Sequence, residues 1–364
     1  MTRVFVGMSG GVDSSVAAAL LVEQGYDVTG VYMKNWSQDL PGMVCPWADD
    51  LADAKRVAVS LGIDFEVFDF EREYSERVVQ YMIDEYSLGR TPNPDIMCNQ
   101  EVKFKLFLEA SLERGADMIA TGHYARVRHG STAHSPTSSQ LLQAVDDNKD
   151  QTYFLYRVTS QALSRTLFPL GDFTKSEVRE MAAKRKLFTA SKKESMGVCF
   201  VGQVDMREFL SQYIDTRPGE VIDRQSGERV GRHDGAVLYT LGQRHGLELG
   251  GGLPYYVVGK DMDANIVYVS RDLNSAAMWR TQIELTDAHW IGPTPPDGEY
   301  SVRVRHRAPL VACTLTGSSV TLHEAQRAIT TGQSGVIYSA TSRGIDGSRV
   351  GFDDGICLGG GIVA

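Results

Sequence analysis

The order of apolar and polar positions divides the chain near residue 213. Before that point, short apolar runs alternate with longer segments whose apolar residues recur at helical spacing. These patterns predict strands over residues 3–9, 28–33, 65–70 and 116–124, and helices over residues 14–25, 50–63, 99–114 and 176–186. Strands that alternate with helices are typical of a parallel sheet covered on both faces. We therefore expect an α/β domain in this part of the chain.

After residue 213 the pattern becomes β-like, with short runs broken by glycines and turn residues. From about residue 275 alternation dominates, as in YSVRVRH, ACTLTG, SVTLHEA and SGVIYSA, which is typical of antiparallel sheets or a small barrel. A chain of 364 residues is also long for a single core. We expect the α/β domain over residues 1–205, a small β-rich domain over residues 206–273 and a β-barrel-like domain over residues 274–364.

The composition is that of an ordinary soluble protein, with 42% apolar and 23% charged residues. No apolar run approaches the length of a membrane span, and the first residues carry no signal-peptide pattern, so we expect a cytoplasmic location. The cysteines lie far apart and form no CxxC pair, which argues against a zinc site and a disulfide framework.

The net charge of −9 at pH 7 argues, taken alone, against a nucleic-acid partner, because contacts with phosphates normally need a basic surface. Local clusters change this picture: KRK at residues 184–186, KK at 192–193 and RVRHR at 303–307. We therefore expect that a polyanion would be met by patches and not by the whole surface.

A glycine-rich loop, SGGVDS at residues 9–14, lies between the first predicted strand and the first predicted helix. Glycines let the backbone approach a phosphate, and free amides at a helix start attract anions. A Walker loop would continue with a lysine that reaches the outer phosphates, and none follows here. The pattern favours a loop that holds the β,γ-pyrophosphate of ATP as a leaving unit and leaves the α-phosphorus open to attack. The alternative is a tight turn in which Asp13 or Ser14 caps the helix.

Two cysteines lie in segments that are unusual for core packing. Cys98 follows the rigid, proline-containing stretch GRTPNPDIM and is expected just before a helix that Asn99 caps, where the amide dipoles favour the thiolate. Cys199 lies between glycines in SMGVCFVG, after two lysines that would also favour the thiolate. The alternative is that both are ordinary buried cysteines, as we expect for Cys45, Cys313 and Cys357.

SGGVDS resembles the signature of the PP-loop ATP pyrophosphatase superfamily (adenine nucleotide alpha hydrolase-like), whose members cleave ATP to AMP and pyrophosphate. Along essentially its whole length, the chain resembles the bacterial-type tRNA-specific 2-thiouridylase family. The ordered matches are GMSGGVDSSV, MKNW, GRTPNPDIMCN, FK, ATGHYAR, DQTYFLY, SMGVCFVG, YTLGQR, GQS near residue 333 and the closing CLGGGI. The resemblance implies a PP-loop domain followed by β-rich domains. It also implies a sulfurtransferase that uses ATP and persulfide sulfur to convert the wobble uridine (position 34) of certain tRNAs to 2-thiouridine.

The chemistry that this resemblance implies has two steps. The C2 oxygen of the uridine attacks the α-phosphorus of ATP, and sulfur then attacks C2 and expels AMP, so that one difficult substitution becomes two easier ones. By the same resemblance Cys199 receives the persulfide, and Cys98 is the nucleophile that closes a transient disulfide with Cys199. The base must be flipped out of the anticodon stack to be reached.

The resemblance also assigns binding residues. ATP is contacted by Gly7, Met8, Ser9, Gly10, Gly11, Val12, Asp13, Ser14, Met33 and Gly122, with Mg²⁺ as the expected counter-ion. The target base is contacted by Asn93, Pro94 and Asp95, and other parts of the tRNA by His123, Asp150, Gln151, Thr152, Arg305, His306 and Gln333. The expected partners are the tRNAs for lysine, glutamate and glutamine, together with a protein that donates persulfide sulfur.

One position departs from the family pattern, because His306 stands where family members often carry tyrosine. Simpler roles are also open for some of these residues: Asp150 and Thr152 could form a turn, and RVRHR a solvated strand face. Three other classes of protein are alternatives. They are an ammonia-using PP-loop synthetase, which needs no paired cysteines, a non-catalytic RNA-binding or sulfur-carrier protein, and a Rossmann oxidoreductase. The lack of GxGxxG after the first strand disfavours the oxidoreductase.

Overall fold

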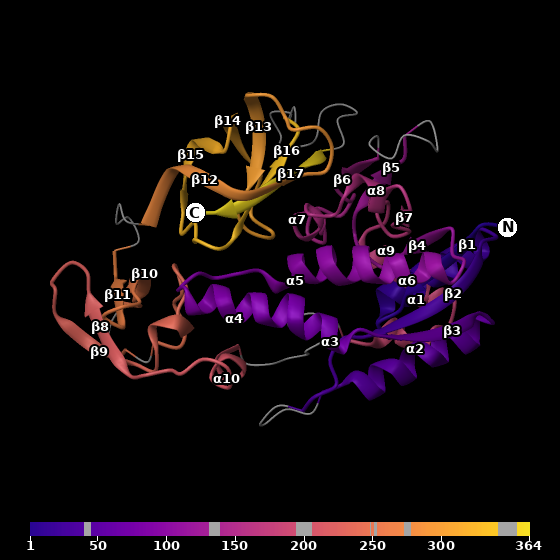
Figure 1. Ribbon diagram of the computed structural model, residues 1–364, viewed down its shortest axis with the longest axis horizontal. Helices are drawn as coiled ribbons and strands as arrows, with labels where there is room; N and C mark the ends of the chain where they lie inside the picture. Colours follow the sequence, from indigo (N-terminus) through magenta and orange to yellow (C-terminus); the bar gives the residue numbers. More distant parts are fainter. Residues whose placement is uncertain are drawn as a thin grey trace.

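The computed structural model describes residues 1–39, 45–130, 139–193, 206–247, 249–250, 253–272, 278–340 and 355–364. Over these residues the chain forms sheets of five, four and eight strands. Figure 1 shows the five-stranded sheet and its helices toward one end of the molecule, with the four-stranded sheet and most of the eight-stranded sheet toward the other.

The N-terminal sheet is parallel and has β1 near its centre. Its strand order is β3-β2-β1-β4-β7, and the paired strands run in the same direction. The strands are β1 (Arg3–Gly7), β2 (Asp27–Lys34), β3 (Asp64–Asp69), β4 (Met118–Ala120) and β7 (Thr166–Leu167). Apolar side chains of β1 are wholly buried on both faces, as expected of a strand covered by helices. This confirms the predicted α/β domain.

The helices of this domain follow the strands in sequence, beginning with α1 (Val12–Glu23), α2 (Trp47–Leu61) and α9 (Lys175–Lys184). Two longer helical stretches each contain a π-helical part. One consists of α3 (Glu71–Tyr74), η1 (Ser75–Val79) and α4 (Gln80–Ser87). The other consists of α5 (Pro94–Met97), η2 (Cys98–Leu106) and α6 (Phe107–Glu113). Shorter helices are α7 (Thr152–Leu155), α8 (Ser160–Leu163), η4 (Phe188–Ser191) and α10 (Met206–Leu210).

The central part is a four-stranded sheet in the order β10-β11-β8-β9. Its strands are β8 (Gly219–Asp223), β9 (Arg229–His233), β10 (Tyr256–Asp261) and β11 (Ile266–Ser270), with the short helix η5 (Ala236–Leu238) beside them. The pair β8–β11 is parallel, and the other pairs are antiparallel. Valines from three of these strands form the small core, namely Val221, Val257, Val267 and Val269.

The C-terminal part is a closed barrel. Its strands are β12 (Trp279–Trp290), β13 (Gly298–Arg303), β14 (Val311–Thr316), β15 (Ser319–Arg327), β16 (Ser334–Tyr338) and β17 (Ile356–Val363). Pairing of β12 with both β15 and β17 closes the ring. In β14 the alternate residues Val311, Cys313 and Leu315 are buried, which is the alternation that predicted the barrel.

A hairpin from the N-terminal part extends the barrel sheet. The strands β5 (Arg126–Arg128) and β6 (Gln140–Leu142) pair with each other, and β6 pairs with β17. Helix α7 lies against the neighbouring barrel strand β16, since the Tyr153 hydroxyl donates to the Ser334 carbonyl over 3.1 Å. The barrel is therefore joined to the α/β part by main-chain pairing as well as by side chains. Within the described residues, no helix has the length and apolar character needed to cross a membrane.

Candidate functional site

The loops after β1 and β4 lie together at the carboxyl edge of the parallel sheet. The strand order places β2 and β3 on one side of β1 and β4 and β7 on the other. Such a reversal creates a crevice beyond the strand ends, where open α/β sheets bind ligands. The loop of residues 8–11 follows β1, and the segment of residues 121–124 follows β4.

Close contacts bring the predicted ATP-binding residues together around the first loop. A Cβ added to Gly7 would lie 2.9 Å from the Met33 Cε atom, and one added to Gly122 would lie 2.8 Å from the Ser14 nitrogen. Gly10 has a φ of +72°, and a Cβ there would lie 2.5 Å from the Asp50 carbonyl oxygen. Gly10 and Gly122 are therefore required by backbone packing around the loop, whereas Gly7 faces the flexible end of the Met33 side chain.

The structure argues against the alternative that Asp13 or Ser14 caps the helix. The N-cap of α1 is Gly11, and among the described residues no side chain caps it. The Ser14 hydroxyl instead accepts from the Ser9 amide over 3.2 Å and donates to the Gly11 carbonyl over 3.2 Å. A Cβ added to Gly11 would meet only the Ser9 hydroxyl, at 3.5 Å. The start of α1 thus keeps amide groups available beside open space, which suits an anion.

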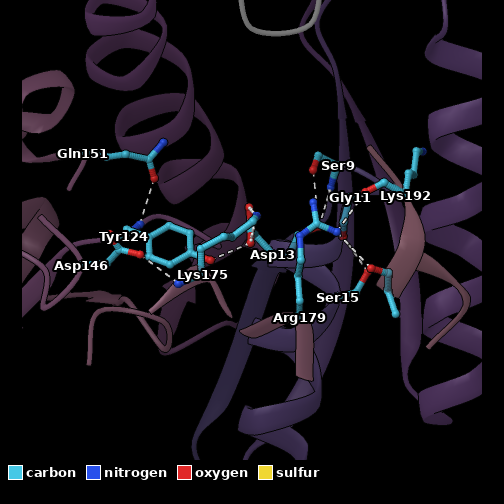
Figure 2. A network of polar contacts seen from close by, with 12 residues as sticks. Ser9, Gly11, Asp13, Ser15, Tyr124, Asp146, Gln151, Lys175, Arg179 and Lys192 are labelled. Carbon is cyan, nitrogen blue, oxygen red and sulfur yellow. Dashed lines mark hydrogen bonds and ion pairs between the residues drawn. The ribbon is translucent and has the colours of Figure 1, made fainter. Parts of the chain in front are cut away.

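Asp13 binds two side chains that the sequence analysis did not single out. Its carboxylate accepts from the Tyr124 hydroxyl over 2.9 Å and from the Lys175 ammonium over 2.7 and 2.8 Å, as Figure 2 shows. Lys175 is the first residue of α9, which begins with a capping box of Thr174 and Glu177. The helix start was visible in the sequence, but its position beside the loop was not. A lysine thus stands next to this phosphate-type loop, although the loop itself contains none.

Two of the basic clusters expected to meet a polyanion are partly neutralised. The Lys192 ammonium lies 2.9 Å from an Asp50 oxygen and 2.7 Å from an Asp53 oxygen. Arg185 lies 2.6 Å from a Glu23 oxygen. These ion pairs weaken the expectation that the KRK and KK clusters serve as patches for a polyanion, because a cation with a local acidic partner contributes less to the external field.

The local prediction for Cys98 is wrong. The helix begins at Pro94, with Asn93 as its N-cap residue, so Cys98 lies beyond the first turn. The thiol is fully buried. Burial raises the pKa of Cys98 to about 12, and the charge of Asp95 acts in the same direction, while Lys103 opposes both. In this conformation the group is a thiol and not a thiolate.

A chain of contacts connects the Cys98 helix to the sheet edge. The Lys103 ammonium, one turn beyond Cys98, lies 3.5 Å from Nε2 of His123, whose Nδ1 lies 2.8 Å from the Thr121 hydroxyl. The imidazole packs between Phe104 and Phe168 at ring distances of 5.7 and 6.3 Å. Burial and the Lys103 charge hold the pKa of His123 well below its ordinary value, so this ring is neutral. The helix that contains Cys98 therefore contacts the segment after β4 through Lys103 and Phe104.

The predicted tRNA contacts near the start of this helix converge. Gln333 donates its amide to the Thr91 carbonyl over 2.7 Å, just before Asn93. His306 packs against Phe154 with the rings tilted by 43° and their centres 4.3 Å apart, and the Asn99 amide donates to the Phe154 carbonyl over 3.0 Å. Residues from the barrel thus lie beside the segment of residues 93–95. Burial and the nearby arginines Arg307 and Arg303 lower the pKa of His306 to about 4.

The DQT segment has a structural role that the sequence analysis did not predict. The Asp150 side chain is fully buried and forms an ion pair of 2.8 Å with Arg303 of β13. Thr152 donates to Asp150 over 2.8 Å and lies 3.0 Å from the Tyr338 hydroxyl. The Gln151 side chain accepts from the Tyr124 amide over 2.9 Å. These positions do not favour a direct contact of Asp150 or Thr152 with tRNA.

One predicted residue, Arg305, stands apart from this cluster. Arg305 is exposed, and its guanidinium donates to the Ala328 carbonyl over 3.2 Å. Cys199 lies outside the described residues, so the predicted pairing with Cys98 stays a prediction. Among the described residues there is also no group of three or more His, Cys, Asp or Glu side chains that could hold a metal ion.

Family models match three consecutive parts of the chain. They are the tRNA methyl transferase HUP domain over residues 2–203, the tRNA methyl transferase PRC-barrel domain over residues 207–271 and the aminomethyltransferase beta-barrel domain over residues 280–363.

Curated relatives match along the full length. The tRNA-specific 2-thiouridylase MnmA of Bacillus subtilis (strain 168) is 45% identical over 371 residues, which cover 100% of this chain and 95% of that protein. The protein of the same name from Chromobacterium violaceum is 45% identical over 372 residues, covering 99% of this chain and 92% of that protein. A solved 4-thiouridine synthetase–RNA complex with bound ATP has a TM-score of 0.37 at 20% identity, over 58% of this chain and 50% of that one.

Proposed function

Because the chain belongs to the tRNA-specific 2-thiouridylase family, we propose that it is a sulfurtransferase that makes 2-thiouridine in tRNA. The observation that carries this proposal is the similarity of 45% identity over the whole chain. The geometry supports it, because a phosphate-type loop and the helix of Cys98 meet at one edge of the sheet.

ATP binds at the loop after β1. The open space beside Gly11 and the uncapped start of α1 suit the pyrophosphate part of the nucleotide. Met33 and Gly122 border the same loop and would contact the remainder of ATP. Attack of the uridine C2 oxygen on the α-phosphorus releases pyrophosphate and leaves an adenylated base.

Asp13 is the carboxylate of this loop and would hold Mg²⁺ together with phosphate oxygens, since protein Mg²⁺ sites commonly use one or two carboxylates plus the substrate phosphates. Bound there, the ion would neutralise the charge of the leaving pyrophosphate. Lys175 already binds this carboxylate and would keep it oriented when the site is filled.

Sulfur transfer uses the two cysteines. The terminal sulfur of a Cys199 persulfide attacks C2 and expels AMP, which carries away the former C2 oxygen. The Cys98 thiolate then attacks the Cys199 sulfur, closes a Cys98–Cys199 disulfide and leaves the transferred sulfur on the base. An external thiol reductant must reopen the disulfide. Because Cys98 is a buried thiol here, tRNA binding must expose and deprotonate it first.

The tRNA is bound by the barrel and by the start of the Cys98 helix. Asn93, Pro94 and Asp95 contact the flipped base, with His306 and Gln333 beside them. The lysine, glutamate and glutamine tRNAs are the expected substrates, and a persulfide-carrying protein is the expected sulfur donor. The enzyme is expected to act in the cytoplasm.

The adenylation step is tested by AMP formation from labelled ATP with and without unmodified tRNA. We expect tRNA-dependent release of AMP and pyrophosphate without added ammonia. Release that requires ammonia and ignores tRNA would point to the synthetase alternative, and no release would point to a non-catalytic protein.

A Lys175→Met variant tests whether ATP binds at the loop after β1. Removal of a charged hydrogen bond of about 1.5–3 kcal/mol leaves Asp13 without its cation, so KM for ATP should rise roughly tenfold or more. Lys175→Arg should retain most of the affinity. An unchanged KM in Lys175→Met would show that the Lys175–Asp13 ion pair does not support ATP binding.

A further inference from the structure

A cavity of about 260 Å³ lies between the central sheet and the barrel. The lining comes from Val258, Gly259 and Lys260 of β10, from Leu241 before that strand, and from the segments at the start of β12 and after β15. These two segments contribute Met278 and Arg280, and Ala328 and Ile329. Three of these residues, Val258, Met278 and Ala328, form a small apolar cluster. The other notable feature of the lining is its two cationic side chains.

Lys260 is the anomaly in this cavity. Its ammonium nitrogen is closed off from solvent and has no hydrogen-bond partner among the residues that the structure describes. Burial lowers the pKa of Lys260 to about 8, so the group still carries its charge at neutral pH. A buried charge without a partner is costly, and native proteins rarely keep one without a reason. A bound anion would supply the missing partner.

Arginines lie in and near the cavity. Arg280 lines it and is exposed. Arg305 donates to the carbonyl of Ala328 on the wall, and Arg327 lies 5.8 Å from the centre of the Tyr256 ring. A cluster of four basic side chains, on a chain whose net charge is −9, marks this place as a local positive patch.

Two loops that line the cavity also contact the segment that precedes Cys98. Leu241 lines the cavity, while its neighbour Thr240 lies 3.2 Å from the Thr91 hydroxyl. Ile329 lines the cavity, while the Gln333 amide beyond it donates to the Thr91 carbonyl. An anion held in the cavity is therefore fixed relative to the residues that approach the target base.

We propose that the cavity of Lys260 and Arg280 binds a backbone phosphate of the tRNA and so anchors the RNA across the junction of the central sheet and the barrel. The long, flexible lysine stem lets the ammonium turn into the cavity, where both cations face the phosphate. This inference rests on the proposed function, because it presupposes that tRNA is the substrate.

The test compares the tRNA affinity of the full chain and its variants across a salt series. Lys260→Met removes the charge but keeps the length of the side chain. We expect about tenfold weaker binding at low salt and a slope of log K against log salt that is smaller by about 1. Lys260→Arg should bind nearly as well as the unchanged chain. Lys55→Met, an exposed lysine on α2 at the other end of the molecule (Figure 1), should change neither quantity.

Thermal unfolding separates this role from a structural one. Loss of an unpaired buried charge should leave Tm of Lys260→Met equal or higher. A lower Tm together with an unchanged salt slope would overturn the proposal, as would wild-type affinity and slope. So would Lys260-dependent binding of inorganic phosphate or pyrophosphate with no effect on tRNA, since the cavity would then serve a free anion. If the wild-type protein thiolates tRNA and Lys260→Met binds tRNA normally, only this inference fails. If the wild-type protein does not bind tRNA, the proposed function fails.

Discussion

At the scale of single residues, the environment of Cys98 differs most from what its sequence context suggested. The two prolines before it indicated an extended segment that ends at a helix start. Pro94 instead occupies the first helical position, which suits proline because the missing amide would have no partner there. Four residues further on, the thiol is buried and its pKa is raised. The chain thus holds its proposed nucleophile in a protected form.

Alkylation kinetics test this protected state. With the pKa of Cys98 raised to about 12, the thiolate fraction at neutral pH is on the order of a thousandfold below that of a free cysteine. We expect Cys98 to react with iodoacetamide far more slowly than glutathione, and faster when tRNA and ATP are present. Cys313, whose pKa burial also raises to about 12, is the matched control and should stay slow in both conditions. Rapid labelling of Cys98 in the free protein would contradict the structure.

At the scale of elements, a clamp holds the segment before the Cys98 helix. The Thr91 amide donates to the Thr331 carbonyl over 3.1 Å, and Gln333 donates back to the Thr91 carbonyl. Gly332 between them has a φ of +91°, and a Cβ there would lie 2.8 Å from the Thr91 nitrogen. A barrel loop thus positions a segment of the α/β part, and only glycine permits so close an approach.

Paired glycine substitutions test the clamp. Gly332→Ala should lower the free energy of unfolding by roughly 2–4 kcal/mol, because backbone strain and a steric clash combine. Gly317→Ala is the control: it lies in the turn after β14, has a φ of +59° and faces open space, so it should cost about 1 kcal/mol. Urea unfolding of both variants gives the comparison. Equal costs would mean that Gly332 does not hold the segment.

The elements differed in how far local pattern could predict them. The strand predicted over residues 3–9 starts where β1 starts and ends two residues after it. The prediction succeeded because a strand buried on both faces is continuously apolar. The alternation that predicted β14 is likewise local. The β5–β6 hairpin was not predicted, since its strands have three residues each and gain their main partner, β17, from the far end of the chain.

The residues of the candidate site also differed in whether local pattern could predict them. Motifs located the loop and Cys98, but long-range packing decided the rest. The lysine beside Asp13 comes from 162 residues away, and the partner of Asp150 from 153 residues away. No local signal could pair these residues. Asp150 was predicted to touch tRNA, whereas its burial against Arg303 gives it a role in joining the barrel.

At the scale of the whole molecule, several kinds of contact join the α/β part to the barrel. They share a sheet through β6 and β17, a buried ion pair between Asp150 and Arg303, and the packing of His306 against Phe154. Breaking a buried pair by removing one partner typically costs about 3–5 kcal/mol. The catalytic part is therefore expected to unfold together with the barrel.

This joint stability should fall in mild acid. Burial and the nearby arginines lower the pKa of His306 to about 4, and burial also lowers that of His123 and His289. The unfolded chain, whose histidines titrate near 6.5, then binds more protons, so the free energy of unfolding falls as pH drops from about 6.5 toward 4. Urea unfolding at pH 7.5 and 5.5 measures the loss. His306→Phe, which keeps an aromatic ring against Phe154, should show a smaller loss, and an equal loss would mean that other groups titrate.

The most direct measurement is mass analysis of tRNA nucleosides after incubation with the protein, ATP, Mg²⁺ and a persulfide donor. We expect a uridine whose mass is raised by the exchange of one oxygen for sulfur, and we expect it only when ATP is present. Cys98→Ala should lose this product, and Cys313→Ala should retain it. Unmodified uridine from the unchanged chain, or full thiolation by Cys98→Ala, would contradict the proposed function.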